Sequence, residues 1–296
     1  MKERKYSYTE TAYALSAVIV ILTIAATAGG LFVDGLYRDN AFATAAWKGT
    51  DLATLAVGLP LLALALAFSL RGSFRAQLVW LGMLDYTLYN YAYYLFGTAF
   101  NGLFLVYVAL FTLSILALIF ALAKVDVGGI RRRFRDRTPV RGIAGYLLFV
   151  AVGIGGLWIA QSLGFVLTGE VPAFVAKVDH PTSIVFALDL SLVVPFLILA
   201  AVWLWQRRPW GYLLAAIMSV KGAVYMLALA AVSLAARQAG FPEAGGELPL
   251  WGLLAAGFVA AGLFLLLNVK PEREEARVWR FPPDPSYGQK TGHLTR

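Results

Sequence analysis

Cysteine is absent from the 296 residues of this chain, and histidine occurs only twice, as His180 and His293. Without cysteine the chain can form no disulfide, no thiolate metal site and no thiol nucleophile. Both histidines lie outside the long apolar runs, so no imidazole can bind a metal or a haem within a membrane. The sequence also lacks a phosphate-binding loop, a serine-hydrolase elbow and a dinucleotide fingerprint. We therefore expect no metal site and no bound cofactor.

Charge is scarce as well. Only 14% of the residues are charged, whereas 60% are hydrophobic, and a soluble domain normally carries about 25% charged residues. This composition predicts an all-α, polytopic membrane helical bundle with the lipid bilayer as its main partner. The formal net charge of +8 comes from basic residues in short segments between apolar runs, as membrane topology requires, so we expect no nucleic-acid partner.

Eight apolar runs are each long enough to cross a hydrocarbon core of about 30 Å. The expected transmembrane helices are residues 11–33, 51–70, 76–97, 101–123, 142–166, 183–206, 210–236 and 249–269. The first run follows a basic leader and contains Ala26-Thr27-Ala28, which also fits a signal peptide with its cleavage site. We interpret this run as a transmembrane helix because the internal repeat described below needs it.

The distribution of lysine and arginine predicts the orientation. With the N-terminus inside, 20 of the 25 basic residues fall in cytoplasmic segments, 4 fall in external segments and Lys221 lies within a span. Cytoplasmic loops are the ones that carry the excess of lysine and arginine. We therefore expect both termini in the cytoplasm.

The two halves of the chain align with a shift of about 135 residues. Gly35 aligns with Gly169, and Pro60 aligns with Pro195 in spans that both end at a basic turn. Each half has four spans, so the repeats enter the membrane in the same direction and are parallel. The expected organisation is a first four-helix repeat (1–123), a basic cytoplasmic linker (124–141), a second repeat (142–269) and a mobile cytoplasmic tail (270–296).

The span at 76–97 contains a polar stretch, DYTLYNYAYY, at helical spacing. At 100° per residue Asp85, Tyr89 and Tyr93 share one stripe, and Tyr86 and Asn90 share the adjoining one. A carboxylate near mid-bilayer costs about 2.5–3.5 kcal/mol on insertion scales, so it marks a candidate site. An alternative is that Asp85 is protonated or bonded to a tyrosine and only holds helices together.

The second half supplies the opposite charge. The internal alignment places Lys221 opposite Asp85 and Tyr225 opposite Tyr89, and parallel repeats put equivalent residues at equal depth. Near the midplane the two charges could therefore meet or share a ligand, and the hypothesis fails if the two helices lie far apart. Asp189 lies near the external end of its span, where it would line the mouth of a cavity or be solvated at the interface.

Three further patterns concern helix shape, helix packing and lipid binding. Pro60 and Pro195 remove one backbone hydrogen bond each and should kink their helices, although proline is common in membrane helices. Glycine and alanine at 156, 160 and 164, and at 252, 256 and 260, are typical of close helix packing. The basic run at 131–137, within the linker, would bind anionic inner-leaflet lipids or serve only as a topology signal. The lipids would bind near Arg131, Arg132, Arg133 and Arg135.

Three segments resemble a group of uncharacterised prokaryotic multi-span membrane proteins: LYNYAYYLFGTAFNGLFLVYVALFTLSILALI (88–119), HPTSIVFALDLSLVVPFLILA (180–200) and RRPWGYLLAAIMSVKGA (207–223). The resemblance implies a multi-pass protein of the prokaryotic plasma membrane, and it implies no mechanism. A lysine in the seventh span with an aspartate in the third is also similar to microbial rhodopsins. The expected eight spans argue against a retinal protein.

Three functions remain open. A small-molecule or lipid-handling protein, plausibly a transporter, would use as its central site Asp85, Tyr89, Asn90, Tyr93, Lys221 and Tyr225. A non-transporting sensor or interaction protein would instead dock a soluble partner on segment 124–141 and the tail. A membrane enzyme is disfavoured, because the spans lack histidine, cysteine and a carboxylate cluster.

Overall fold

The computed structural model describes residues 8–271, and every regular element in that range is helical. In order these are α1 (Tyr8–Phe32), α2 (Ala41–Ala53), the π-turn η1 (Thr54–Gly58), α3 (Leu59–Leu70), α4 (Phe74–Gly97), α5 (Phe104–Leu122), α6 (Val127–Arg133), α7 (Val140–Thr168), α8 (Ala173–Val178), α9 (Ile184–Leu188), the π-turn η2 (Asp189–Val193), α10 (Val194–Trp205), α11 (Pro209–Gln238), the 3-10 helix η3 (Pro242–Glu247) and α12 (Leu248–Leu267). The leader before residue 8 and the expected tail beyond residue 271 lie outside the described residues.

Seven of the helices in the described residues are long and apolar enough to cross a membrane. They cover Thr9–Phe32, Ala41–Leu70, Phe104–Leu122, Val140–Thr168, Ile184–Trp205, Pro209–Gln238 and Pro242–Leu267. This confirms the prediction of a helical, multi-pass membrane protein. The expected third span is also one helix, α4 with 24 residues, but its tyrosines, Asn90 and Asp85 make it less apolar than the other seven.

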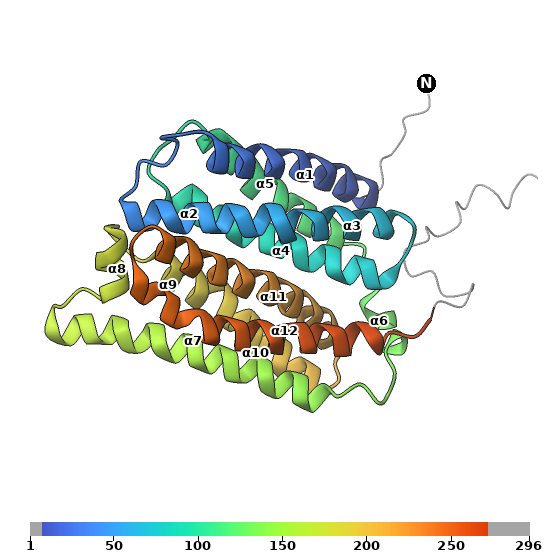
Figure 1. Cartoon of the computed structure of the whole chain (residues 1–296). Coiled ribbons are helices and arrows are strands. Elements are labelled where there is room, and N and C mark those ends of the chain that lie inside the picture. Colours follow the sequence, from blue (N-terminus) through green and yellow to red (C-terminus); the bar gives the residue numbers. More distant parts are fainter. Residues whose placement is uncertain (1–7, 272–296) are drawn as a thin grey trace, which may run out of the picture.

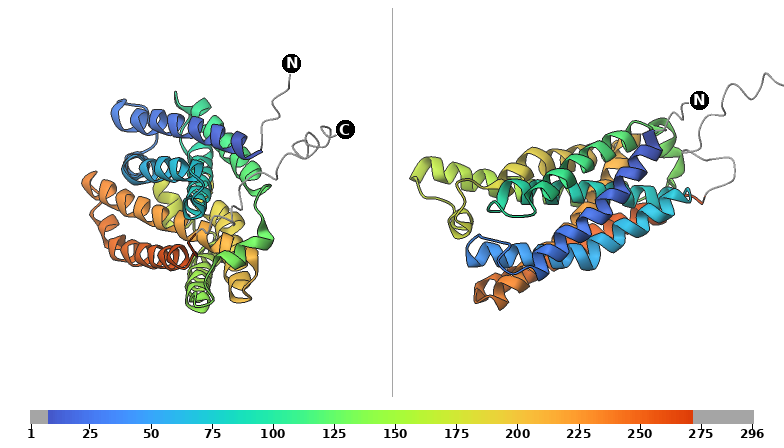
Figure 2. Two further views of the ribbon diagram at one scale, coloured as in Figure 1. Left: turned by 90° about the vertical axis from the view of Figure 1, so that its right-hand side faces the viewer. Right: turned by 90° about the horizontal axis from the view of Figure 1, so that it is seen from above.

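The helices form two groups that follow the two halves of the sequence (Figure 1; Figure 2). Helices α1 to α5 form one group, and α7 and α9 to α12 form the other. Helix α11 is the core element: 78% of its most apolar window is buried, against 28–39% in the other six candidate spans. It packs against α10 and α12 of its own half and against α2 and α4 of the first half.

One predicted boundary was wrong. Residues 41–50, expected in an external connector, form the beginning of the second long helix, which runs without a break through α2, η1 and α3. Asn40 caps this helix by accepting a hydrogen bond from the backbone N–H of Ala43 at 2.8 Å. The equivalent connector in the second half does contain a short separate helix, α8.

Both prolines sit directly after a π-turn. Pro60 follows η1 (Thr54–Gly58) and Pro195 follows η2 (Asp189–Val193), at the same point of the second long helix in each half. A proline leaves the carbonyl four residues earlier without its usual donor, and one wider turn accommodates the change. The π-turn rotates the residues before it relative to those after it, which determines where Asp189 points.

Close approaches between helices occur at glycines other than those the sequence pattern suggested. A Cβ at Gly49 would lie 2.7 Å from the carbonyl oxygen of Ala231, and α2 therefore packs tightly on α11. In contrast, Gly156, Gly164 and Gly252 have no neighbouring atom within 4 Å of an added Cβ. The prediction of close packing at those three positions was wrong, because a stripe of small residues does not specify which face meets a partner.

The two halves differ at one helix pair. In the first half α1 packs along α5, whereas α7 and α12, the helices that the alignment of the two halves pairs with them, make few contacts. They are joined at Tyr146, whose hydroxyl donates to the carbonyl oxygen of Leu254 at 2.6 Å and whose ring packs edge-on against Phe258. As a result the second half of α7 is largely exposed on the protein, as Leu163 and Leu167 illustrate.

Candidate functional site

The candidate site lies where α4 of the first half packs against α11 of the second. At Gly82 the helices approach so closely that an added Cβ would lie 2.6 Å from Cβ of Val220 and 3.0 Å from the carbonyl oxygen of Ile217. Small residues permit such approaches between membrane helices. Asp85 follows Gly82 by about one turn, and Lys221 follows Val220 directly, so this contact brings the two charges to the same level.

Asp85 and Lys221 form an ion pair. The Nζ of Lys221 lies 3.5 Å from Oδ2 of Asp85, and the lysine side chain is 5% exposed while that of Asp85 is 22% exposed. The same Nζ lies 4.4 Å from the ring centroid of Tyr89, within range of a cation–π interaction. Oδ2 of Asp85 is buried and makes no hydrogen bond within residues 8–271. This carboxylate oxygen therefore lacks a hydrogen-bond donor, although it belongs to the ion pair.

Asp189 completes this cluster from η2. Its Oδ1 accepts a hydrogen bond from the Tyr89 hydroxyl at 2.7 Å, and its Oδ2 accepts one from Nε1 of Trp158 at 2.8 Å. The Tyr89 hydroxyl also lies 3.2 Å from the Tyr225 hydroxyl, with the two rings packed edge to face. Asp189, expected at a cavity mouth or at the interface, is only 4% exposed and belongs to the buried centre.

The central cluster has an uneven charge count. Asp85 and Asp189 supply two carboxylates to the cluster, and Lys221, which pairs with Asp85 and lies over the Tyr89 ring, supplies its positive charge. With all three groups ionised the cluster carries a net charge of −1 in a buried setting, and an uncompensated buried charge is costly. The cluster therefore favours the uptake of one positive charge, either a proton on a carboxylate or a bound cationic group.

The structure does not bring every predicted site residue to this cluster. Asp85, Tyr89, Lys221, Tyr225 and Asp189 meet, as described above. Tyr86 turns instead toward η1, where its hydroxyl lies 2.7 Å from Oγ1 of Thr54. Tyr93 packs on Trp47, with ring centroids 4.5 Å apart, and Asn90 is buried with 2% of its surface exposed.

A second polar cluster, which the sequence analysis missed, surrounds Asp51 in α2. Oδ2 of Asp51 accepts a hydrogen bond from the Tyr37 hydroxyl, and Oδ1 accepts one from the Tyr94 hydroxyl at 2.9 Å. Asp51 is 2% exposed, and within residues 8–271 it forms no ion pair. Burial raises the pKa of Tyr37, which lies outside the spans, and the negative charge of Asp51 raises it further. Tyr37 therefore remains a protonated donor to Asp51.

Two features of the sequence hid the residues that were missed. Because of Lys48, residues 34–50 were interpreted as a polar connector, and Asp51 was placed at the end of a span. Asn40, a good N-cap followed by an alanine-rich run, was the available signal that the helix begins earlier. Trp158 carried no signal, because its bond to Asp189 depends on how α7 and η2 are rotated.

A cavity of about 520 Å³ lies at the end of the bundle opposite α6. Its lining includes Gly97 and Ile184, and a Cβ at Gly97 would lie 3.2 Å from the Trp47 ring. Trp47 in turn packs against Tyr93, with the ring planes tilted by 47°, and Tyr93 lies one turn beyond Tyr89 in α4. An aromatic pair, Trp47 and Tyr93, therefore lies between this cavity and the central cluster.

Comparison of the chain with family models, with curated proteins and with solved structures found no match.

Proposed function

We propose that this protein is a membrane transporter that moves a small solute together with protons, and that the cluster of Asp85, Tyr89, Asp189, Lys221 and Tyr225 is its central binding site. One observation carries this proposal: in the buried contact between the halves, the Asp85–Lys221 ion pair and a second buried carboxylate, Asp189, meet at Tyr89. Ionisable residues inside membrane spans are costly and typically mark substrate or proton pathways.

The hydrogen bonds of the cluster allow Asp189 to gain and lose a proton without moving any heavy atom. When Asp189 is ionised, the Tyr89 hydroxyl donates to its Oδ1 across 2.7 Å. When Oδ1 carries a proton, that proton is donated to the Tyr89 oxygen, and Tyr89 turns its own hydrogen to the Tyr225 oxygen 3.2 Å away. Trp158 donates to Oδ2 in both states, so the carboxylate keeps its position.

The Asp85–Lys221 pair provides the charge for a solute. Its N–O distance of 3.5 Å is longer than a tight, hydrogen-bonded ion pair of about 2.7–2.9 Å. A polar solute gains a carboxylate acceptor and an ammonium donor by inserting between them. The external cavity and the Trp47–Tyr93 pair form the expected route from one side, with the aromatic pair as the gate.

The proposal includes a topology. We propose eight transmembrane helices with α4 as the third, two parallel four-helix repeats, cytoplasmic termini and a location in a prokaryotic plasma membrane. Supports for the repeat are the π-turns before Pro60 and Pro195 and the positive φ of Gly35 (70°) and Gly169 (75°) after the first helix of each half. In this orientation α6 and its arginines face the anionic inner leaflet.

Purified full-length protein in liposomes that contain the pH dye pyranine tests the proton step. An imposed pH gradient should be dissipated by the wild-type protein and not by Asp189→Asn, because the amide cannot take up the proton. Asp126→Asn is a matched control, since Asp126 is an exposed N-cap of α6 and lies outside the cluster. Equal proton flux in all three proteins contradicts the proton pathway.

Native mass spectrometry of the gently purified protein tests the solute step. A bound non-lipid molecule in the wild-type protein that is lost in Lys221→Met identifies the solute and its place. The control is Lys48→Met, which removes an exposed lysine of α2. Retention of the same molecule by Lys221→Met refutes the proposed site.

A further inference from the structure

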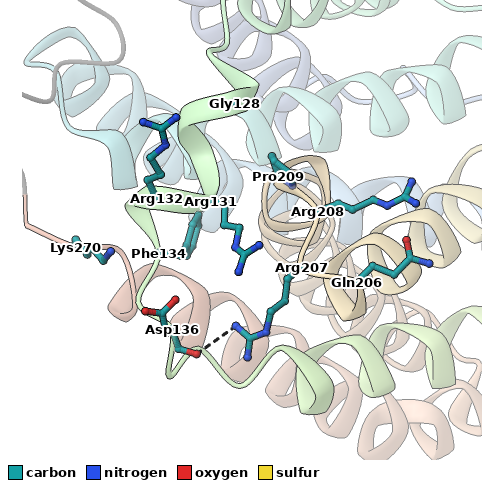
Figure 3. A pocket seen from close by; sticks show the side chains of 10 residues that line it. All are labelled: Gly128, Arg131, Arg132, Phe134, Asp136, Gln206, Arg207, Arg208, Pro209 and Lys270. Carbon is teal, nitrogen blue, oxygen red and sulfur yellow. Dashed lines mark hydrogen bonds between the residues drawn. The ribbon is translucent and has the colours of Figure 1, made fainter.

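A second cavity, of about 570 Å³, opens at the α6 end of the bundle (Figure 3). Its lining comes from α6 and the segment after it, from the turn between α10 and α11, and from the residues after α12. Five cations line it, namely Arg131, Arg132, Arg207, Arg208 and Lys270, against one carboxylate, Asp136. Its volume falls within the range of about 300–1,000 Å³ that is typical of small-ligand sites.

Arg207 has an unusual backbone conformation for its residue type. Its φ is 54°, in the left-handed region that favours glycine. The turn between α3 and α4 is the equivalent turn of the first half, and there the residue with positive φ is a glycine, Gly72, at 87°. Both turns have the same closing hydrogen bond, from Ser73 N–H to the Phe68 carbonyl and from Arg208 N–H to the Trp203 carbonyl. The second turn thus accepts backbone strain to place an arginine side chain.

The side chain of Arg207 is held in position. Its Nη1 donates to the backbone carbonyl of Asp136 at 3.2 Å and lies 3.4 Å from the Tyr212 hydroxyl. In Figure 3 the Arg131 side chain, from α6, extends toward Arg207 on the side of Phe134. Among residues 8–271 no carboxylate forms an ion pair with Arg131, Arg207 or Lys270. These positive charges are therefore available to an external anion.

The cavity lies at the level where a helical bundle meets lipid headgroups. Trp205 at the end of α10 is 55% exposed, and Trp210 at the beginning of α11 is 37% exposed, on either side of the turn that carries Arg207. Exposed tryptophans concentrate at membrane interfaces, where one part of the ring is apolar and the other is wet. An anion at this level can arrive from the bilayer or from the aqueous phase.

We infer that this cavity is a phosphate-binding site in which Arg131 and Arg207 bind the phosphate oxygens and Lys270 adds charge. Arginine is suited to this role because its planar guanidinium donates two parallel hydrogen bonds to a phosphate. The ligand is a phosphate ester, carried either by the headgroup of an anionic phospholipid or by a soluble molecule. The site is separate from the central cluster and does not depend on the transport proposal.

The decisive variant is Arg207→Gly. Glycine is the residue of the equivalent turn in the first half, so we expect the variant to fold with an unchanged or higher melting temperature. Phosphate binding should fall on the order of tenfold or more, because a fixed, charge-assisted donor is lost. Arg131→Gln should weaken binding similarly. The control is Arg71→Gln, which removes one charge from the equivalent turn of the first half, outside the cavity lining.

Two probes distinguish the sources of the phosphate. Full-length protein in phosphatidylcholine nanodiscs is titrated with inorganic pyrophosphate by calorimetry, and detergent-solubilised protein is titrated with phosphatidylglycerol by native mass spectrometry. Binding of pyrophosphate that is lost in Arg207→Gly supports a soluble phosphate ester; binding of phosphatidylglycerol alone, lost in the same variant, supports a headgroup. Equal binding by the wild-type protein and Arg207→Gly, an equal loss in Arg71→Gln, or no binding of either probe refutes the site.

Discussion

The charge count of the central cluster predicts an asymmetry between two substitutions that break the same ion pair. Across 3.5 Å, at an effective dielectric constant of about 20, Asp85 and Lys221 attract each other by about 5 kcal/mol before the cost of removing both from water. Lys221→Met removes the cation of the cluster, so its two carboxylates, Asp85 and Asp189, remain uncompensated. Asp85→Asn leaves one cation, Lys221, and one carboxylate, Asp189, in the cluster, which becomes neutral.

We therefore expect Lys221→Met to destabilise the protein by about 3–5 kcal/mol, as when a buried pair loses one partner. Asp85→Asn should cost only about 1–2 kcal/mol, since the 22% exposed carboxylate is partly hydrated and its loss removes the excess charge. The double variant should be more stable than Lys221→Met alone, because one of the two uncompensated charges is gone.

Reversible unfolding in mixed detergent micelles, with increasing dodecyl sulfate, measures these free energies. All three variants are compared in the same detergent, and Lys48→Met serves as the reference for the loss of an exposed lysine. A larger cost for Asp85→Asn than for Lys221→Met would refute the charge count. It would show that Asp189 is neutral and that Asp85 alone compensates the lysine.

The remaining predictions concern packing and topology. Gly30→Ala should destabilise the protein by about 2 kcal/mol or more, because a Cβ there would collide with the Asp51 carboxylate. Gly153→Ala should be neutral or slightly stabilising, because this position faces open space. Thermal unfolding of the two variants measures the difference. Since the chain has no cysteine, single cysteines report topology directly. In intact cells an impermeant maleimide should label Glu170→Cys and not Arg137→Cys, and the reverse pattern would contradict the proposed orientation.

The sequence was sufficient to predict those parts of the fold that depend on local pattern. Seven of the predicted spans are helices that are long and apolar enough to cross a membrane, because an apolar run of about 20 residues has few other structures open to it. The alignment of the two halves predicted equal depth for Asp85 and Lys221 and left their contact open, and the structure places the pair 3.5 Å apart. Equal depth could be predicted because it depends only on the position of each residue along its own helix.

What the sequence could not predict depends on rotation and on choice of face. The bond from Trp158 to Asp189 requires a particular rotation of α7 and the wider turn of η2. Small residues at Gly156 and Gly252 carried the pattern of close packing, yet both face open space, while Gly82 supplies the contact of α4 with α11. A pattern gives the periodicity of a helix, and the neighbouring helices decide which face is used.

The burial of Lys221 near the middle of α11 has an electrical consequence. A unit charge that crosses the whole membrane experiences about 2.3 kcal/mol per 100 mV of membrane potential, so a proton that reaches mid-depth experiences about half of that. This corresponds to a change of about sevenfold in proton occupancy for each 100 mV. On the proposed function, the charge state of the Asp85, Asp189 and Lys221 cluster follows the membrane voltage as well as the pH. A change in voltage alone should then change the fraction of sites that carry a proton.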